Sequence, residues 1–206
     1  MESIIVYADL LCPFTHAGLH TLLDRRAMLG VTVPQLDIRA WPLELVNGQP
    51  LDAHHVAAEI VGMRATVCPD LFEGFSVVAF PSTAMVAYSL TVAAAATRDI
   101  SLIEAVGMAL RDAVFEEGLD IADGNVIADL ARGFGLDPTD RVTTEAAVRS
   151  DWAQGKRQGV VGSPHFFVGA ENYFCPGLDI SRDEHGVFHI AWKPNAQEFF
   201  DRAFGG

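Results

Sequence analysis

The chain has 206 residues, and its 14 lysines and arginines against 27 aspartates and glutamates give a formal net charge of −13. A folded chain of this mass buries about 70% of its extended-chain surface, so it can form one large domain or two small ones. Because nucleic acids and anionic membranes bind clustered Lys and Arg, the acidic balance argues against both as partners. Hydrophobic residues make up 50% of the chain, which excludes intrinsic disorder.

The cysteines are Cys12, Cys68 and Cys175, and no two of them form a CxxC pair. An odd, scattered set of this kind argues against a disulfide framework. No positive residue precedes the short apolar run at the N-terminus, so we expect no signal peptide and a location in the reducing cytoplasm. The longest apolar segment, residues 84–96, is too short to span a membrane and is expected to be a buried helix.

A strand, a helix and a second strand are predicted near the N-terminus. Residues 4–8 are rich in β-branched and aromatic types, as a strand buried on both faces requires. Pro13 suits the first turn of a helix, and apolar residues follow it at helical spacing up to Gly30. Residues 33–41 are predicted to be the second strand, and this order implies a parallel pair with a right-handed crossover.

Helix signals dominate the middle of the chain. Helices are predicted over residues 82–97, 101–118, 123–135 and 139–157. Ser101 and Glu104 are expected to form a capping box at the start of the second of these helices. Short strands follow at residues 165–169, in a segment ending near Cys175, and at residues 187–192, and a helix over residues 195–204 closes the chain.

Cys12 is the first candidate for chemistry, because it lies at the predicted strand-to-helix turn just before Pro13. The partial positive charge of a helix N-terminus favours a thiolate over a thiol, which would make Cys12 a nucleophile. The alternative is a small buried apolar residue. The second feature is Pro164, immediately before an apolar strand, where a cis Ser163–Pro164 bond is consistent with a tight turn.

Three segments together resemble the DsbA-like thioredoxin superfamily: DLLCPFTHAG (residues 9–18), WPLEL (residues 41–45) and GVVGSPHFFV (residues 159–168). The closest branch is that of the FrnE-type oxidoreductases and 2-hydroxychromene-2-carboxylate isomerases. The resemblance implies an α/β thioredoxin-like domain (residues 1–50 and 158–206) interrupted by an all-helical insertion domain (residues 51–157), with the active site between them. It also implies that Cys12 is the nucleophile and that Ser163 and Pro164 hold the bound thiol or peptide.

The chain departs from the family's CxxC motif, because Thr15 takes the place of the second cysteine in CPFT. Cys12 cannot form the usual internal disulfide, but exchange through a mixed disulfide needs only one thiolate and an external thiol. We therefore predict a thiol-disulfide oxidoreductase or thiol transferase that uses glutathione or another low-molecular-weight thiol. Thr15 is expected to donate a hydrogen bond to the Cys12 sulfur, and His16 to tune its charge.

The sequence leaves two other functions open. One is a glutathione-dependent isomerase of the 2-hydroxychromene-2-carboxylate type, in which Cys12 replaces the usual serine and orients or activates the thiol. The other is a non-catalytic binding protein that has kept the fold. Cys175 is a candidate second redox cysteine if its Cα lies within about 7 Å of that of Cys12. Cys68 is interpreted as structural.

Further side chains are predicted to complete a thiol or substrate site around Cys12. The predicted binding residues are Pro13, Phe14, Trp41, Ser163, Pro164 and His165. An apolar groove built from Phe14, Trp41, Phe166, Tyr173 and Phe174 would suit an aromatic or hydrophobic substrate.

Zinc binding is the rival chemistry, since Cys12, His16 and His20 follow at helical i, i+4 spacing. Because Cys12 falls at the helix boundary, where that spacing fails, we predict no metal. His54 and His55 are assigned no role. The oligomeric state stays open, with a homodimer as one option.

Overall fold

A four-stranded sheet forms the centre of the computed structural model, which describes residues 3–205. Its strands, in the spatial order β2-β1-β3-β4, are β1 (Ser3–Ala8), β2 (Gln35–Ala40), β3 (His165–Val168) and β4 (Glu171–Phe174). β1 and β2 are parallel, whereas β3 runs antiparallel to β1 and β4 runs antiparallel to β3. The predicted parallel pair at the start of the chain is confirmed, and the fold class is α/β.

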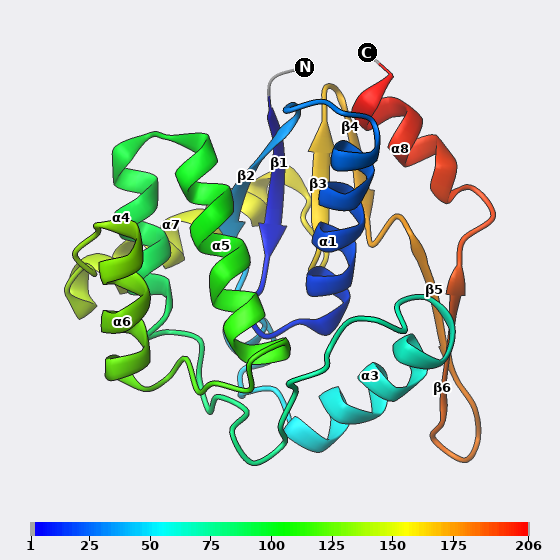
Figure 1. Ribbon diagram of the computed structural model, residues 1–206, viewed down its shortest axis with the longest axis horizontal. Coiled ribbons are helices and arrows are strands. Elements are labelled where there is room, and N and C mark those ends of the chain that lie inside the picture. The colour runs from blue at the N-terminus through cyan, green and yellow to red at the C-terminus, as the bar shows by residue number, and fades with distance from the viewer. Residues whose placement is uncertain (1–2, 206) are drawn as a thin grey trace.

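Helices flank this sheet, and a separate hairpin lies beside it (Figure 1). The helices are α1 (Pro13–Met28), α2 (Leu43–Asn47), α3 (Ala53–Thr66), α4 (Tyr88–Thr97), α5 (Ile100–Phe115), α6 (Gly124–Phe134), α7 (Arg141–Gln158) and α8 (Ala196–Phe204). The hairpin joins β5 (Leu178–Arg182) to β6 (Phe188–Trp192). α3 packs against β6, where the Thr66 hydroxyl donates to the Ile190 carbonyl at 2.7 Å.

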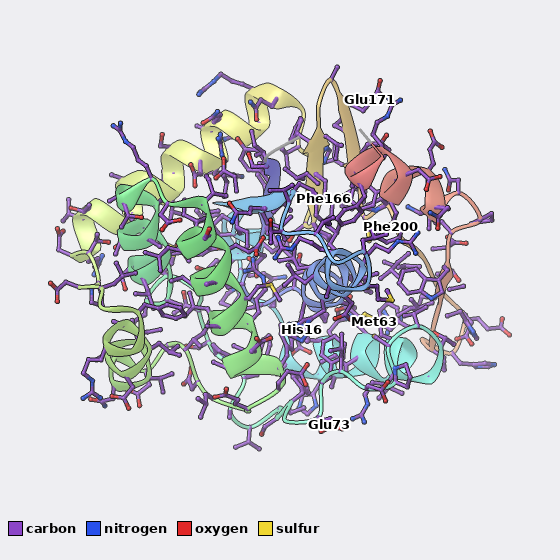
Figure 2. All side chains as sticks on the ribbon, turned by 45° about the horizontal axis from the view of Figure 1, so that its top comes forward. His16, Met63, Glu73, Phe166, Glu171 and Phe200 are labelled. Atoms are coloured by element: carbon purple, nitrogen blue, oxygen red, sulfur yellow. The ribbon has the colours of Figure 1, made fainter. Side chains whose placement is uncertain are left out.

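Alternating side chains of β1 divide the core between the two faces of the sheet. Val6 lies in a cluster with Leu19 of α1 and Met108 of α5. Its neighbour Tyr7 lies in a second cluster, which Trp152 of α7 also joins. Because successive residues of a strand face opposite sides, β1 is buried on both faces. Figure 2 shows the resulting layers, with α7 on one side of the sheet and α1 and α5 on the other.

Several predicted helix boundaries are confirmed. Asp123 precedes α6 and its side chain accepts the backbone N–H of Asn125, while Gly135 ends this helix in the left-handed conformation. Asp140 caps α7 in the same way through Val142 and Thr143. An aspartate in this position satisfies N–H groups that have no partner within the helix.

The predicted capping box at the start of α5 is wrong. Asp99 is the capping residue, and its carboxylate accepts the backbone N–H groups of Ser101 and Leu102. Glu104 is therefore not needed at the helix start, and it binds Arg26 of α1 and the backbone N–H of Leu36 instead. The Glu104 side chain, which a capping box would use within α5, therefore connects α5 to α1 and to β2.

The helix predicted over residues 82–97 begins only at Tyr88. Before it, the Thr83 hydroxyl donates to Glu44 and accepts the Met85 N–H, which holds this part of the chain in turns. The apolar segment 84–96 lies largely in the ten-residue helix α4. Within residues 3–205, no helix is both long and apolar enough to cross a membrane.

The division into two domains stays a prediction, but two helices assigned to the insertion pack on the central sheet. α5 brings Met108 to one face of the sheet, and α7 brings Trp152 to the other. α5 approaches β2 so closely that a Cβ on Gly107 would lie 2.7 Å from the Ile38 side chain. The helical block therefore contributes to the same core as the sheet.

Gly155 allows α7 to lie close to an aromatic pair on the sheet. A Cβ at this position would lie 2.7 Å from the ring of Trp41 and 3.0 Å from that of Tyr7. The two rings pack edge to face with their centroids 6.2 Å apart, and both are buried. A larger residue would have to push α7 away from the sheet.

Gly155→Ala is expected to destabilise the fold by about 1–3 kcal/mol, because the added methyl group forces the core apart. Gly133→Ala is the matched control in α6, where nothing lies within 4 Å of the new Cβ. It is expected to stabilise the protein by about 0.5–1 kcal/mol through helix propensity. Urea denaturation followed by circular dichroism measures both changes. An equal effect of the two substitutions would contradict the packing role of Gly155.

Candidate active site

Cys12 is the residue that precedes α1, and its backbone is extended while Pro13 opens the helix. Its side chain makes no capping hydrogen bond within the helix. The sulfur instead donates to the backbone carbonyl of Ser163 at 3.4 Å, across 151 positions of the chain. The Ser163–Pro164 peptide bond is cis. The fold thus brings together the two motifs that the sequence singled out.

Ser163 connects this contact to the end of β1 and to α1. Its hydroxyl oxygen accepts the backbone N–H of Asp9 at 2.8 Å. The same hydroxyl shares a hydrogen bond of 2.6 Å with the Thr15 hydroxyl. Because either oxygen of this pair can be the donor, the Thr15 proton is available to the Cys12 sulfur when Ser163 donates to Thr15.

Burial decides the protonation state of Cys12. The residue is only 3% exposed, and burial raises the pKa of its thiol to about 12, while hydrogen bonding from Thr15 opposes the change. A rise of this size from 9.0 corresponds to about 4 kcal/mol, whereas a helix N-terminus is worth about 1 kcal/mol or less. Burial therefore opposes the expected thiolate, and its effect on the pKa is larger than that of the helix N-terminus.

A buried carboxylate holds the loop between β1 and α1. Asp9 accepts the backbone N–H groups of Leu11 and Leu43, each at 2.6 Å. Burial raises its pKa to about 6, and Arg111 opposes this. The guanidinium of Arg111, fully buried in α5, donates to the Asp9 carbonyl at 3.1 Å and to the Gly107 carbonyl at 2.6 Å. Cys12 thus lies at the end of a loop that is fixed from both sides.

A cavity of about 290 Å³ opens beside Cys12. The residues that line it are Cys12, Pro13, Phe14, Leu43, Asn47, Leu51, Asp52, His55, Val56, Glu59, Gly162, Ser163 and Phe174. Among them are Cys12, Pro13, Phe14 and Ser163 from the predicted thiol site, and Phe174 from the predicted apolar groove. The cavity takes its walls from both predicted domains, since α3 and the segment before it face the start of α1.

The sequence did not predict that α3 forms one wall of this cavity. Glu59 lies on it, and burial raises the pKa of its carboxyl to about 7. His55, which was assigned no role from the sequence, lies 3.4 Å from Glu59 and also lines the cavity. The available signal was the helical i, i+4 spacing of His55 and Glu59, which places both on one face of α3.

Three predicted binding residues lie outside this cavity. The Trp41 ring packs against Tyr7 and α7, because it belongs to the core of the opposite sheet face. The His165 ring is held by the Val161 N–H at Nδ1 and by Asn172 at Nε2, at 3.4 and 3.1 Å. Pro164 points to a second, apolar cavity behind the loop.

The cysteines do not converge. All three are free thiols, so no disulfide joins Cys12 to Cys175. Cys175 and Cys68 line the second cavity together with Pro164 and Phe166, whereas Cys12 lines the first. Burial raises the pKa of the Cys175 thiol. The structure therefore offers Cys12 no second sulfur from this chain at its cavity.

The ring of His16 is turned toward α5 rather than toward Cys12. Its Nε2 lies 2.6 Å from the Glu116 carboxylate, and the ring packs against Phe72 and Phe115. These contacts therefore do not support the predicted effect of His16 on the charge of Cys12. Cys12 also does not come together with His16 and His20 as a third zinc ligand. The residue that gathers with the two histidines is Asp112.

A sheet of this order, with a cysteine ahead of its first helix and a cis-proline turn opposite, defines a thioredoxin-fold protein. The family model described as a DSBA-like thioredoxin domain matches residues 3–182. The chain belongs to this family, so the predicted superfamily and thioredoxin-like fold are confirmed. No curated protein matches the chain significantly.

Solved structures agree with this assignment. A 2-hydroxychromene-2-carboxylate isomerase has a TM-score of 0.56 and 16% identity, with 84% of this chain and 88% of that one covered. The cytosolic disulfide reductase DsbM from Pseudomonas aeruginosa has a TM-score of 0.57 and 20% identity, covering 98% and 96%. DsbM with GSH has a TM-score of 0.55 and 21% identity, covering 83% and 88%. At these identities the likeness establishes the fold.

Glu59→Gln is expected to stabilise the protein above neutral pH. The folded pKa of about 7 lies above the ordinary 4.5, so the folded state holds the extra proton between these values and wild-type stability falls as pH rises through them. At about pH 8 the variant should be more stable by about 2–3 kcal/mol, and near pH 4 the two should be equal. Glu184→Gln, with a side chain 88% exposed, is the control and should change neither value. Parallel pH profiles for wild type and Glu59→Gln in urea denaturation would refute the assignment.

Proposed function

We propose that this protein is a thiol-disulfide oxidoreductase in which Cys12 alone carries the exchange, with glutathione or another low-molecular-weight thiol as its partner. One observation carries the proposal: the Cys12 sulfur lies on the carbonyl of Ser163 at the wall of a cavity, apart from the other two cysteines. The DsbM structure with GSH supports a small thiol as the partner. A reducing cytoplasm suits this chemistry, and DsbM is described as cytosolic.

The reaction is a pair of exchanges at one sulfur. The Cys12 thiolate attacks the glutathione sulfur of a mixed disulfide, the old S–S bond breaks, and the substrate leaves as a thiolate that takes up a proton. A glutathione thiolate then attacks the sulfur bound to Cys12, which regenerates Cys12 and releases oxidised glutathione. The substrate disulfide gains two electrons and two glutathione molecules, one of them brought by the substrate, become oxidised glutathione.

The side chains that line the cavity have different roles in this reaction. Phe14, Leu43 and Val56 offer an apolar wall to the body of the bound thiol. Glu59, whose pKa lies near neutrality, is the group on this wall suited to accept the proton that Cys12 gives up. Ser163 holds the neutral thiol through its carbonyl until that proton is lost.

A second candidate is an isomerase that uses glutathione as a cofactor. The observation that favours it is the raised pKa of Cys12, because a neutral thiol can donate a hydrogen bond to a glutathione thiolate without exchanging electrons. Cys12 would then orient the cofactor against an aromatic or hydrophobic substrate. The isomerase among the similar structures has the same fold.

Treatment of the full chain with oxidised glutathione is expected to place one glutathione on Cys12, which mass spectrometry of tryptic peptides detects. Cys12→Ser should lose the adduct at this position. The matched control is the double variant Cys68→Ser/Cys175→Ser, which should keep it. Absence of an adduct on Cys12 in the folded wild type would overturn the oxidoreductase proposal.

For Glu59→Gln, which lacks the carboxylate proposed to accept the Cys12 proton, the rate of this reaction is expected to rise by about tenfold for each pH unit from about pH 6 to pH 9, because the thiolate fraction of a group with a pKa far above that range grows in this proportion. Stopped-flow measurement with an aromatic disulfide reagent gives the profile. A plateau below about pH 8 would mean a thiolate stabilised in the folded state, against the effect of burial. Turnover of an aromatic substrate that is independent of this profile would favour the isomerase.

A further inference from the structure

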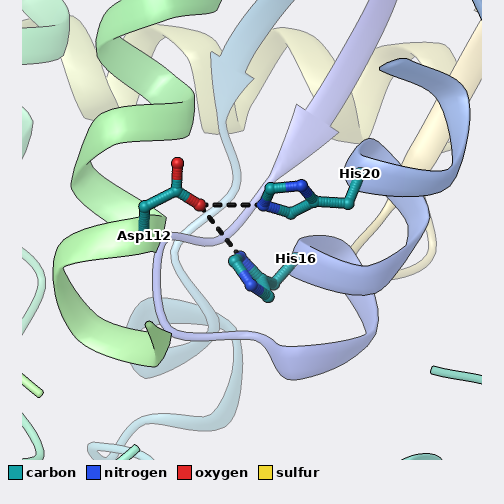
Figure 3. A group of neighbouring side chains, drawn as sticks. All are labelled: His16, His20 and Asp112. Carbon is teal, nitrogen blue, oxygen red and sulfur yellow. Dashed lines mark hydrogen bonds and ion pairs between the residues drawn. The ribbon is translucent and has the colours of Figure 1, made fainter. Parts of the chain in front are cut away.

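Two helices place histidines and carboxylates opposite one another, away from the Cys12 cavity. His16 and His20 are one turn apart on α1, Asp112 lies in the last turn of α5, and Glu116 is the residue that caps the end of α5. The imidazoles of His16 and His20 face the Asp112 carboxylate across the two helices (Figure 3). The Glu116 carboxylate lies 2.6 Å from Nε2 of His16. None of the four residues lines the cavity beside Cys12.

We propose that His16, His20 and Asp112 bind a divalent transition-metal cation of the Zn²⁺ type, with Glu116 as the residue that positions His16. The ligand atoms are already gathered: one nitrogen from each histidine and one oxygen from Asp112 lie within 4.8 Å of one another. The Asp112 oxygen lies 2.8 Å from Nε2 of His20 and 3.9 Å from Nδ1 of His16. This proposal departs from the sequence-based prediction of no metal.

Glu116 fixes the direction in which the His16 ring presents its nitrogens. Its carboxylate accepts the backbone N–H groups of Phe72 and Glu73, at 2.7 and 3.2 Å, and lies 2.6 Å from Nε2 of His16. A carboxylate in this position can only accept, so Nε2 of His16 carries the proton. The lone pair of His16 is therefore on Nδ1. A carboxylate bound to the far nitrogen is the arrangement that orients metal-binding histidines in proteins.

Nδ1 of His16 is a buried atom without a hydrogen-bond partner among the described residues. The side chain is 0% exposed, so water does not satisfy this nitrogen from the surface. Buried polar atoms are almost always paired, and an unpaired one needs an explanation. The Nδ1 lone pair points toward Asp112 and His20, and a cation bound there would give this nitrogen a partner.

The distances fit a tetrahedral cation after small movements. Zinc lies about 2.0–2.1 Å from nitrogen and about 2.0–2.2 Å from carboxylate oxygen, so two of its ligands are about 3.4 Å apart. The two distances of 2.8 and 3.9 Å lie on either side of this value. Asp112 and His20 have side chains 34% and 23% exposed, so a cation can enter from this side and water can fill the fourth position.

The ligand set selects the class of cation. Two imidazoles and one carboxylate suit zinc and its neighbours in the transition series, whereas magnesium and calcium prefer oxygen ligands alone. Glu116 adds negative charge beside the three ligands, because its carboxylate lies 2.6 Å from Nε2 of His16. The same negative potential attracts a divalent cation.

Calorimetric titration of the chelator-treated full chain with Zn²⁺ at about pH 7.5 tests the proposal. Wild type is expected to bind one cation through this site, and His20→Gln and Asp112→Asn should each weaken binding at least tenfold. Loss of the positioning carboxylate in Glu116→Gln should cost about 10–100-fold in affinity. Mg²⁺ should not compete with Zn²⁺.

The matched control is His189→Gln, which removes an exposed histidine that pairs with Asp183 at 3.0 Å and does not belong to the group formed by His16, His20 and Asp112. It should bind Zn²⁺ as wild type does. Co²⁺ gives a second readout, because its visible spectrum reports nitrogen and oxygen ligands and lacks the sulfur charge-transfer band that binding by a cysteine would produce.

Circular dichroism confirms that each variant is folded, and the rise in melting temperature with Zn²⁺ should disappear in His20→Gln and Asp112→Asn. Folded wild type that binds no Zn²⁺, or variants that bind it equally well, would overturn the proposal. The glutathione adduct on Cys12 should be unchanged in both variants, so the two proposals fail independently.

Discussion

The contact between the start of α1 and the turn before β3 is the constraint on which the site depends. Ser163 makes it with three groups at once: its carbonyl accepts from the Cys12 sulfur, and its hydroxyl binds the Asp9 backbone and the Thr15 side chain. The antiparallel pairing of β1 with β3 brings these residues together, and Asp9 with Arg111 fixes the loop from the side of α5. If that pairing shifted, Cys12 would lose its hydrogen-bond acceptor and one wall of its cavity.

Desolvation sets the chemical character of Cys12. The same packing that gives the sulfur a fixed place also removes water from it, and a thiolate without water is costly. A helix N-terminus favours the thiolate by too little to compensate. The site is therefore one in which deprotonation of Cys12 must be assisted, which gives importance to Glu59 on the facing helix.

α1 serves two sites from different parts of its surface. Its first residues, Pro13 and Phe14, line the cavity together with Cys12, which precedes the helix, and the following turns present His16 and His20 to α5. The helical block is needed for both, since α3 closes the cavity and α5 supplies Asp112. This division explains why His16, only one turn from Cys12, is engaged elsewhere.

The sequence by itself determined the order of the elements and the two motifs of the site. The apolar run of β1, Pro13 at the start of α1, and Asp123 and Gly135 around α6 are local signals, because a strand face, a cap or a helix end depends on neighbouring residues. Cys12, Thr15 and Ser163 could be selected through a family resemblance, and they do meet. Tertiary structure alone decided how deeply Cys12 is buried, that Trp41 belongs to the core, and that Glu59 and His55 line the same cavity as Cys12. It also turned His16 toward Glu116, because desolvation and side-chain partners depend on residues far apart in the chain.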